Sequence, residues 1–266
     1  MCTKSVVVEK NILFIWRGRI LYAGVDGYTT EPHQHYAASL LIGLDAPLTL
    51  RVDDAVAQPR CVLLGPNLYH QSLSSSRVIV LQLDPDSEWY EPIGRWLGSA
   101  GYREIPYDRL AAFEHRFGEL YLEMLDCAGA ERLYHDLLEN LWGPRPERPP
   151  IDERIARLIE ELKTELPDQI GVAELAQRVG LSEDRFMHVF KSEMGLPVRR
   201  YLLWLRLHQA ARLMTDGVTL TEAAHAAGFS DSAHMSRTFK DNFGVPPSSF
   251  LGPNQKNVKV TICTDD

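Results

Sequence analysis

The chain has 266 residues, with 28 Lys and Arg against 36 Asp and Glu, so its formal net charge is −8. This acidic balance excludes a protein that binds nucleic acid through bulk positive charge, and leaves only recognition by a local basic face. Because no apolar run approaches the roughly 18 residues of a membrane-spanning helix and no signal-peptide pattern is present, we expect a cytoplasmic protein with no membrane partner.

Residues 1–142 have the pattern of a β-rich domain followed by helices. From 107 to 142 apolar residues recur at steps of three and four, which predicts an antiparallel helix pair that either packs on the β domain or joins two copies of the chain in a homodimer. Closely spaced strands before it favour a sandwich or a small barrel. The predicted strands are Asn11–Arg17, Ile20–Gly24, Ser39–Gly43, Leu48–Val52, Cys61–Leu64 and Arg77–Leu83.

Three histidines stand out in the β-rich segment. His33 and His35 are two residues apart at the entry to a strand and can share one face, and His70 follows a Gly-Pro turn. Three imidazoles suit Zn²⁺ or another transition metal, so these residues are candidate metal ligands. They are also candidates for an effector pocket, unless they only hydrogen-bond to the backbone. The aromatic walls of such an effector pocket would be Trp16, Tyr22 and Tyr36, each of which could equally be part of the ordinary core.

A proline-rich segment divides the chain. Residues 143–150 contain four prolines in eight residues, a composition typical of a stiff, extended linker. We therefore predict domains at 1–142 and 151–252, with a tail at 253–266 that is either disordered or an added strand. Because the four cysteines are scattered without a C-x-x-C pair, we expect a reducing compartment and no disulfide framework.

The C-terminal domain contains one pattern twice. Residues 172–197 and 220–246 each predict a short helix, a turn with a glycine, and a longer helix with a polar outer face, the signature of a helix-turn-helix. Two such units can read successive major grooves about 34 Å apart. The matching pairs are Ala176 and Ala224, Gly180 and Gly228, Ser182 and Ser230, Phe190 and Phe239, Lys191 and Lys240, Gly195 and Gly244, and Pro197 and Pro246.

The predicted recognition helices span 182–193 and 231–242, with Ser182 and Ser230 as their N-caps. Arg237 suits a base contact, because Arg can pair bidentately with guanine, whereas Arg185, Lys191 and Lys240 suit phosphate. From 185 to 240 there are 8 basic and 4 acidic residues, so the charge here is locally positive. The side chains predicted to contact DNA are Asp184, Arg185, His188, Lys191, Ser232, Ala233, His234, Arg237 and Lys240.

With both halves at this separation, residues 151–252 resemble the DNA-binding domain of the AraC/XylS family of bacterial transcription regulators. The resemblance implies a monomeric seven-helix module with two recognition helices. Because both recognition helices lie in one segment that the proline-rich linker isolates, we predict that residues 151–252 fold and bind DNA alone as a monomer. The His-x-His element is similar to that of a cupin, the small β-barrel that many such regulators carry as a sensor, although residues 37–43 lack the Glu of the cupin metal pattern. We therefore expect an all-β cupin-like barrel with a helix pair, followed by an all-α double helix-turn-helix.

The expected function is sequence-specific transcription regulation, as an activator or a repressor, in response to a small-molecule effector. The partners would be double-stranded DNA, the effector and RNA polymerase, and the one cofactor foreseen is a transition metal. The alternative is a cupin-type metalloenzyme fused to a DNA-binding domain. The missing Glu argues against an enzyme, as does the lack of a Ser-His-Asp set, a Gly-rich phosphate loop or paired catalytic carboxylates.

Overall fold

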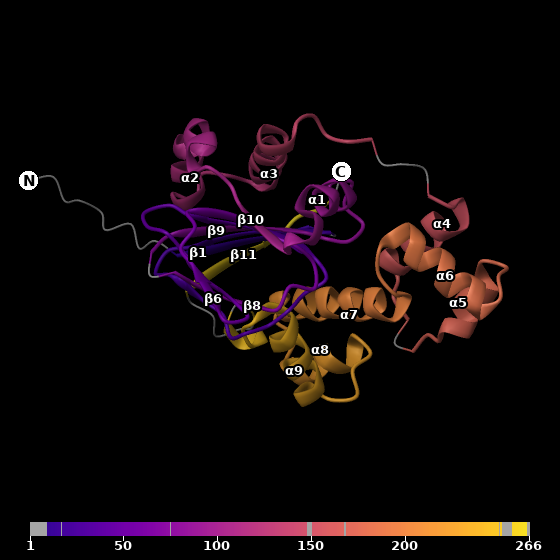
Figure 1. The fold of residues 1–266 in the computed structure, drawn as a ribbon. Helices are drawn as coiled ribbons and strands as arrows, with labels where there is room; N and C mark the ends of the chain where they lie inside the picture. The colour runs from indigo at the N-terminus through magenta and orange to yellow at the C-terminus, as the bar shows by residue number, and fades with distance from the viewer. Residues whose placement is uncertain are drawn as a thin grey trace, which may run out of the picture.

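The computed structural model describes residues 10–16, 18–74, 76–147, 151–167, 169–249, 251 and 257–264. It has a sheet-rich N-terminal part and a helical C-terminal part (Figure 1). Within the predicted linker the described residues are 143–147, which form no helix or strand, and 148–150 lie outside the description. Among the described residues, no helix combines the length and the apolar character needed to cross a membrane.

The strands form two sheets that are not closed into a barrel, so the expected barrel closure is wrong. A physical reason is visible at β1, whose outer edge is occupied in parallel by β11 from the C-terminal tail. The larger sheet has the order β10 (Tyr102–Glu104), β7 (Cys61–Leu64), β4 (Ala38–Gly43), β9 (Val78–Leu83), β2 (Arg19–Gly24), β1 (Asn11–Ile15), β11 (Val258–Ile262). The smaller has the order β3 (Tyr28–Thr29), β8 (His70–Ser74), β5 (Thr49–Val52), β6 (Ala55–Ala57).

The six predicted strands are confirmed with ends shifted by two residues or fewer; Arg17 lies outside the description. The predicted helical segment is also confirmed, and it packs on the larger sheet together with an additional helix. Figure 1 shows these helices above the sheet, α7, α8 and α9 below it, and α4, α5 and α6 to the right. The helical elements are α1 (Tyr90–Leu97), η1 (Gly98–Ala100), η2 (Tyr107–Phe113), α2 (Glu114–Tyr121) and α3 (Cys127–Trp142).

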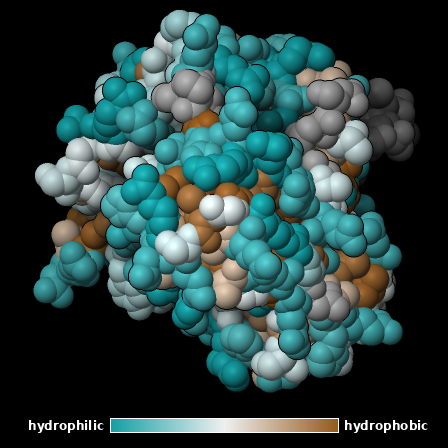
Figure 2. All heavy atoms as spheres, turned by 90° about the vertical axis from the view of Figure 1, so that its right-hand side faces the viewer, coloured by the Kyte–Doolittle hydropathy of each residue, from teal (hydrophilic) through white to brown (hydrophobic). Residues whose placement is uncertain are grey.

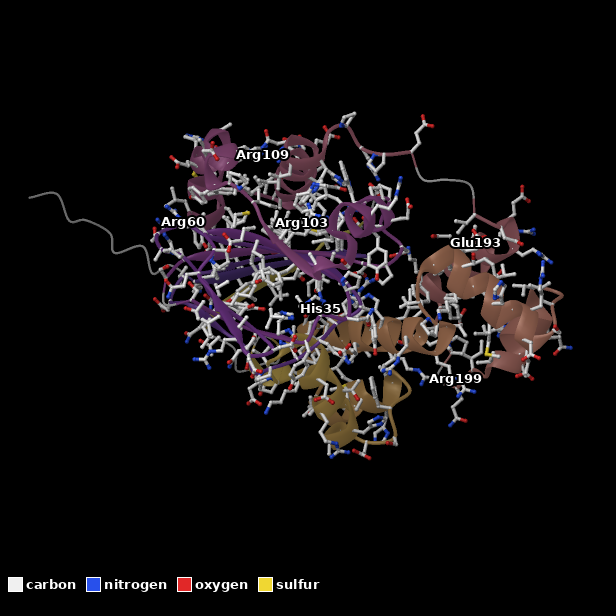
Figure 3. The ribbon with its side chains drawn as sticks, viewed as in Figure 1. His35, Arg60, Arg103, Arg109, Glu193 and Arg199 are labelled. Atoms are coloured by element: carbon white, nitrogen blue, oxygen red, sulfur yellow. A yellow bond between two sulfur atoms is a disulfide. The ribbon has the colours of Figure 1, made fainter. Side chains whose placement is uncertain are left out.

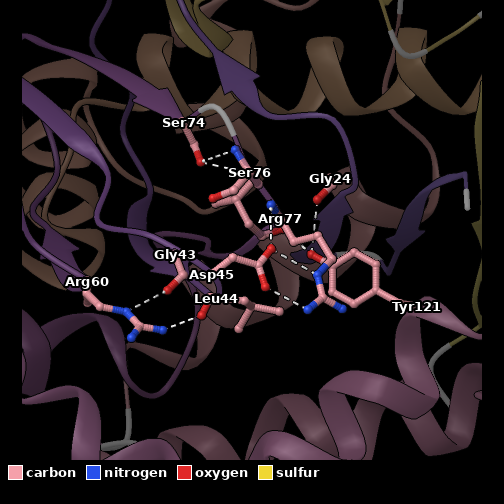
Figure 4. Close-up of polar contacts among 10 residues, drawn as sticks. Gly24, Gly43, Leu44, Asp45, Arg60, Ser74, Ser76, Arg77 and Tyr121 are labelled. Carbon is pink, nitrogen blue, oxygen red and sulfur yellow. Dashed lines mark hydrogen bonds and ion pairs between the residues drawn. The ribbon is translucent and has the colours of Figure 1, made fainter.

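Polar contacts fix α2 on the end of the sheet (Figure 4). The Tyr121 hydroxyl lies 3.1 Å from the carbonyl oxygen of Gly24 and 2.9 Å from that of Val78, to which it donates. Arg77 donates through Nη2 and Nε to the carboxylate of Asp45, at 2.7 and 3.0 Å. These contacts join β2, β9 and the loop after β4 beneath one helix.

The C-terminal part contains the two expected helix-turn-helix units. Ser182 caps the first recognition helix as predicted, but the second is capped by Asp231, whose carboxylate accepts from the His234 amide, so the prediction of Ser230 is wrong. The extra residue in the second copy displaces its cap by one position. The elements are α4 (Glu153–Thr164), α5 (Val172–Arg178), α6 (Glu183–Met194), α7 (Val198–Thr215), α8 (Leu220–Ala226), α9 (Ser232–Phe243) and η3 (Pro247–Ser249).

The second helix-turn-helix shares its core with the sheets. One apolar cluster joins Leu13 of β1 and Leu50 of β5 to Leu207 of α7 and Phe239 of α9. The first unit, by contrast, packs with α4 and the start of α7 in a cluster of its own, to which residues 36 and 37 also contribute. That residues 151–252 fold and bind DNA alone stays a prediction, and such a fragment would expose Leu207 and Phe239 to water.

A disulfide joins Cys127, at the start of α3, to Cys263, just after β11. The expectation of no disulfide is therefore wrong, because the tail strand brings together two cysteines 136 residues apart in sequence, with Cα atoms 5.6 Å apart. Cys61 is a buried free thiol in β7. Of the two alternatives for the tail, residues 258–262 form the added strand.

Candidate DNA-reading and effector sites

The first recognition helix, α6, turns its predicted DNA-contacting side chains to solvent. Phe186 and Phe190 are buried on its inner face, and Asp184, Arg185, His188 and Lys191 are exposed on the other. Figure 2 views the molecule from the α4–α6 end, where hydrophilic side chains cover most of the surface around a hollow that shows apolar atoms. This helix is therefore available to a ligand as the sequence predicts.

The second recognition helix, α9, also has a buried inner face and a polar outer face, but part of it contacts the sheet-rich part of the chain. Met235 and Phe239 are buried, while Ala233, His234 and Arg237 are exposed. Ser232 and Lys240 are half-buried.

The engagement of α9 comes from the loop of residues 30–35, which precedes β4. Lys240 forms an ion pair with Glu31 at 2.7 Å, and the Glu31 amide donates to the carbonyl oxygen of Gly244 at 2.7 Å. The Gln34 amide donates to the Asp241 carbonyl at 3.3 Å. Within the described part of the chain, Lys191, which occupies the equivalent position on α6, has no ion-pair partner, so the two recognition helices differ in availability.

His33, His35 and His70 converge, as the sequence led us to expect. Each offers one ring nitrogen within 4.8 Å of those of the other two, and all three residues are buried. His33 and His70 face each other in an isolated antiparallel bridge, with both backbone hydrogen bonds at 2.9 Å. Figure 3 places His35 between the strands and α7.

Backbone carbonyls orient all three imidazoles. The Nδ1 atoms of His33, His35 and His70 lie 2.9, 2.8 and 2.9 Å from the carbonyl oxygens of residues 31, 37 and 68. A carbonyl only accepts, so each Nδ1 carries the proton and each Nε2 is an acceptor. At His35 the Ser39 hydroxyl, 3.3 Å away, donates to that Nε2.

Burial keeps these imidazoles neutral near pH 7. Desolvation, reinforced by the neighbouring His70, lowers the pKa of His33 to about 4. The same two causes, with a further contribution from His33, put the pKa of His35 well below its ordinary value. Desolvation also lowers the pKa of His70. Neutral imidazole is the form that ligates metals.

A cavity of about 100 Å³ lies between the sheets and the C-terminal helices. Tyr22 and the three histidines line it, as predicted for an effector pocket, together with Leu207 of α7 and Phe239 and Phe243 of α9. Two of the aromatic residues named with them lie elsewhere. Trp16 packs on the helix-covered face of the larger sheet, and the hydroxyl of Tyr36 accepts from Arg200 in a separate surface depression.

Sequence reasoning missed a buried polar cluster that links the two parts of the chain. Asp84, just after β9, accepts from Trp204 Nε1 at 2.8 Å and lies 3.7 Å from His208 Nε2, both on α7. Asp86 pairs with Lys163 of α4. Desolvation, with the nearby Asp86, raises the pKa of Asp84 well above its ordinary value. The Asp-Pro-Asp sequence after a buried strand was the available signal.

Comparison with known proteins agrees with the helix-turn-helix pattern that the C-terminal part contains twice. Residues 175–252 match a family model described as a helix-turn-helix domain. The arabinose operon regulatory protein of Escherichia coli K12 is 29% identical over 160 residues, 55% of each chain. The HTH-type transcriptional activator RhaS of Yersinia pestis Pestoides F is 31% identical over 125 residues, 46% of each. The chain thus spans about half the length of the regulators it matches.

Two solved structures of ToxT from Vibrio cholerae strain SCE256 share the fold. An apo form has a TM-score of 0.55 at 14% identity, covering 87% of this chain and 96% of that one. The wild-type form bound to an unsaturated fatty acid has a TM-score of 0.51 at 12% identity, covering 87% and 94%. The likeness extends over both the sheet-rich and the helical parts.

Proposed function

The chain carries an AraC-type helix-turn-helix domain at its C-terminus, and on that premise we propose that it is a ligand-responsive, sequence-specific transcription regulator. The observation that carries the proposal is the unequal state of the two recognition helices. Arg185 and Lys191 of α6 are exposed, whereas Lys240 of α9 is paired with Glu31 of the sheet-rich domain. A molecule that changes this docking would change how both helices meet one duplex.

The cavity lies where such a molecule would act. Its walls come from the sheets on one side and from α7 and α9 on the other. A ligand shifts an equilibrium only by its different affinity for the two states, and a ligand between the domains contacts both partners of the docking. The fatty acid bound to the similar fold of ToxT supports a small-molecule role for this architecture.

Regulation is favoured over the alternative, a metalloenzyme fused to a DNA-binding domain. The relatives of known role are named as regulators, and one of them as an activator. We propose that this chain acts in the cytoplasm, where the chromosome lies, with RNA polymerase as a partner. A homodimer through the α2–α3 face belongs to the same proposal, and sedimentation of the full chain would test it.

Selection of full-length protein on random duplex DNA tests the function. We expect enrichment of a site with two half-sites about one helical turn apart, since two recognition helices read successive major grooves on one face of the duplex. Gel shifts on the enriched site and on a scrambled duplex would then give the specificity ratio at stated salt. Equal binding to both duplexes would refute sequence-specific regulation.

A further inference from the structure

The three-histidine cluster has the geometry of a metal site. Three neutral imidazoles present ring nitrogens within 4.8 Å of one another in a buried position. Each Nδ1 is fixed by a backbone carbonyl, the kind of outer contact that sets the tautomer and orientation of metal-bound histidines. Within the described residues, neither His33 Nε2 nor His70 Nε2 accepts a hydrogen bond from protein, and both side chains line the cavity.

Purely structural histidines account for this gathering less well. Three buried imidazoles lie together at the wall of one cavity, and a ligand nitrogen of each is within 4.8 Å of those of the other two. A cation among them takes up the three acceptor nitrogens together, with the Ser39 hydroxyl released from His35.

We propose that His33, His35 and His70 bind one divalent transition-metal ion of the Zn²⁺ class, and that its occupancy controls the docking of α9. Three nitrogen ligands with a fourth, open position suit such an ion, and the cavity supplies room for water or an effector at that position. The proposal rests on the regulatory function proposed above and assigns its ligand.

The link to α9 runs through His33. A Cβ built on Gly244, the residue that ends α9, would lie 2.5 Å from His33 Nδ1, so this imidazole and the helix end are in close contact. Tetrahedral ligation at about 2.0–2.1 Å puts ligand nitrogens about 3.3 Å apart, less than the 4.8 Å that bounds the cluster here. As part of this proposal, closing the cluster to ligation distance moves the Nε2 side of His33 toward the ion and its Nδ1 side away from Gly244.

The sign of the effect follows from this movement. Withdrawal of His33 loosens the contact that holds α9, and Lys240 leaves Glu31 more readily. Metal should therefore raise the affinity for a specific DNA site. A second arrangement, in which metal clamps the loop and lowers that affinity, would contradict the direction but not the site.

The first experiment measures metal on the full-length chain. Protein stripped with a chelator is titrated with Zn²⁺ against a chromophoric competitor, and bound metal is counted after dialysis. We expect one ion per chain for the wild type and none for the triple variant His33→Gln/His35→Gln/His70→Gln. The control His115→Gln removes an exposed histidine of α2 and should keep the ion. Equal zinc in the wild type and the triple variant overturns the proposal.

A second measurement uses only the wild type, so it stands even where the triple variant fails to fold. Bound Co²⁺ should give the visible ligand-field bands of a low-coordinate nitrogen site without a thiolate charge-transfer band. A thiolate band would place the metal on a cysteine, and no band at all would mean no site; either result overturns the proposal.

Gel shifts with and without Zn²⁺ complete the test. We expect specific affinity to rise at least threefold in the wild type and to be unchanged in the triple variant. Unchanged affinity in a zinc-loaded wild type refutes the coupling. Zinc binding by a protein that binds no specific DNA would instead refute the regulatory function and leave the metal site standing, so the two failures are distinguishable.

Discussion

Gly244 and His33 are in direct contact across the two parts of the chain: a Cβ on Gly244 would lie 2.5 Å from His33 Nδ1 and as close to Cβ of Thr30. Gly195 ends the first recognition helix in the same left-handed conformation, with φ of 73° against 70°. A Cβ there would meet only Tyr90, at 3.5 Å, an ordinary contact. Comparing the same substitution at the two glycines therefore separates the strain of a left-handed helix end from the contact between the two parts of the chain.

We predict that Gly244→Ala undocks α9, whereas Gly195→Ala does not. Both variants lose about 1–2 kcal/mol from the left-handed backbone. Only Gly244→Ala adds a collision with His33, which costs further stability or is relieved by separation of α9 from the loop. Thermal unfolding should show the lower Tm for Gly244→Ala, and gel shifts should show its higher affinity for a specific site. Equal behaviour of the two variants would show that the contact carries no docking energy.

Glu31→Gln should release Lys240 for a phosphate contact. The pair is partly exposed, so its loss changes the free energy by about 0.2–1 kcal/mol, a few-fold in affinity at most. One added phosphate contact should also steepen the salt dependence of log K by about one. The control is Glu123→Gln, which removes the surface pair with Lys259 on the tail. A similar salt slope for Glu31→Gln, Glu123→Gln and the wild type would argue against Lys240 as a phosphate ligand.

The disulfide makes a separate prediction about stability. It closes a loop of 136 residues, for which the entropic stabilisation is of the order of 5 kcal/mol, and measured values are commonly about 2–4 kcal/mol. Reductant should therefore lower the Tm of the wild type and leave the variant Cys127→Ser/Cys263→Ser unaffected.

Thiol counting provides the independent check on that bridge. The chain has four cysteines, and a disulfide between two of them leaves 4 − 2 = 2 thiols. Denatured, unreduced protein should then titrate two thiols, and reduced protein four. Four thiols in both states would mean that residues 127 and 263 are not bridged.

The fold was predictable where local pattern decides it. Short apolar runs bounded by Gly, Pro, Asp and Ser located six strands, and the repeated Ala, Gly and Phe positions located both helix-turn-helix units, because these signals need no distant partner. The strand β8 was not predicted, and β11 was only one of two alternatives for the tail. The first reads His-Gln-Ser-Leu-Ser, too polar to stand out, and the second is defined by pairing with β1, some 250 residues earlier in the sequence.

The candidate site was predictable only in part. The two-residue spacing of His33 and His35 indicated a shared face, but the bridge that adds His70 is a long-range pairing. Trp16 and Tyr22 looked equivalent in sequence. They lie on opposite faces of the larger sheet, and only knowledge of what covers each face separates them. The docking of α9 on residues 30–35 leaves no local signal at all.

The assignment of roles on the recognition helices gives the last prediction. Arg237 is exposed on α9 and can pair bidentately with a guanine, so Arg237→Ala should cost about 1–3 kcal/mol on the specific site and relax the preference at one base pair. Lys191 is exposed on α6 and suits phosphate. Lys191→Ala should weaken specific and scrambled duplexes alike and reduce the salt slope by about one.

Arg132→Ala is the control for charge alone, since Arg132 is exposed on α3, outside the helix-turn-helix units. It should leave both the specificity ratio and the salt slope near those of the wild type, because a charge that contacts no phosphate releases no counterion. Gel shifts at several salt concentrations measure both quantities for each variant. A specificity ratio in Arg237→Ala equal to that in Arg132→Ala would show that Arg237 reads no base.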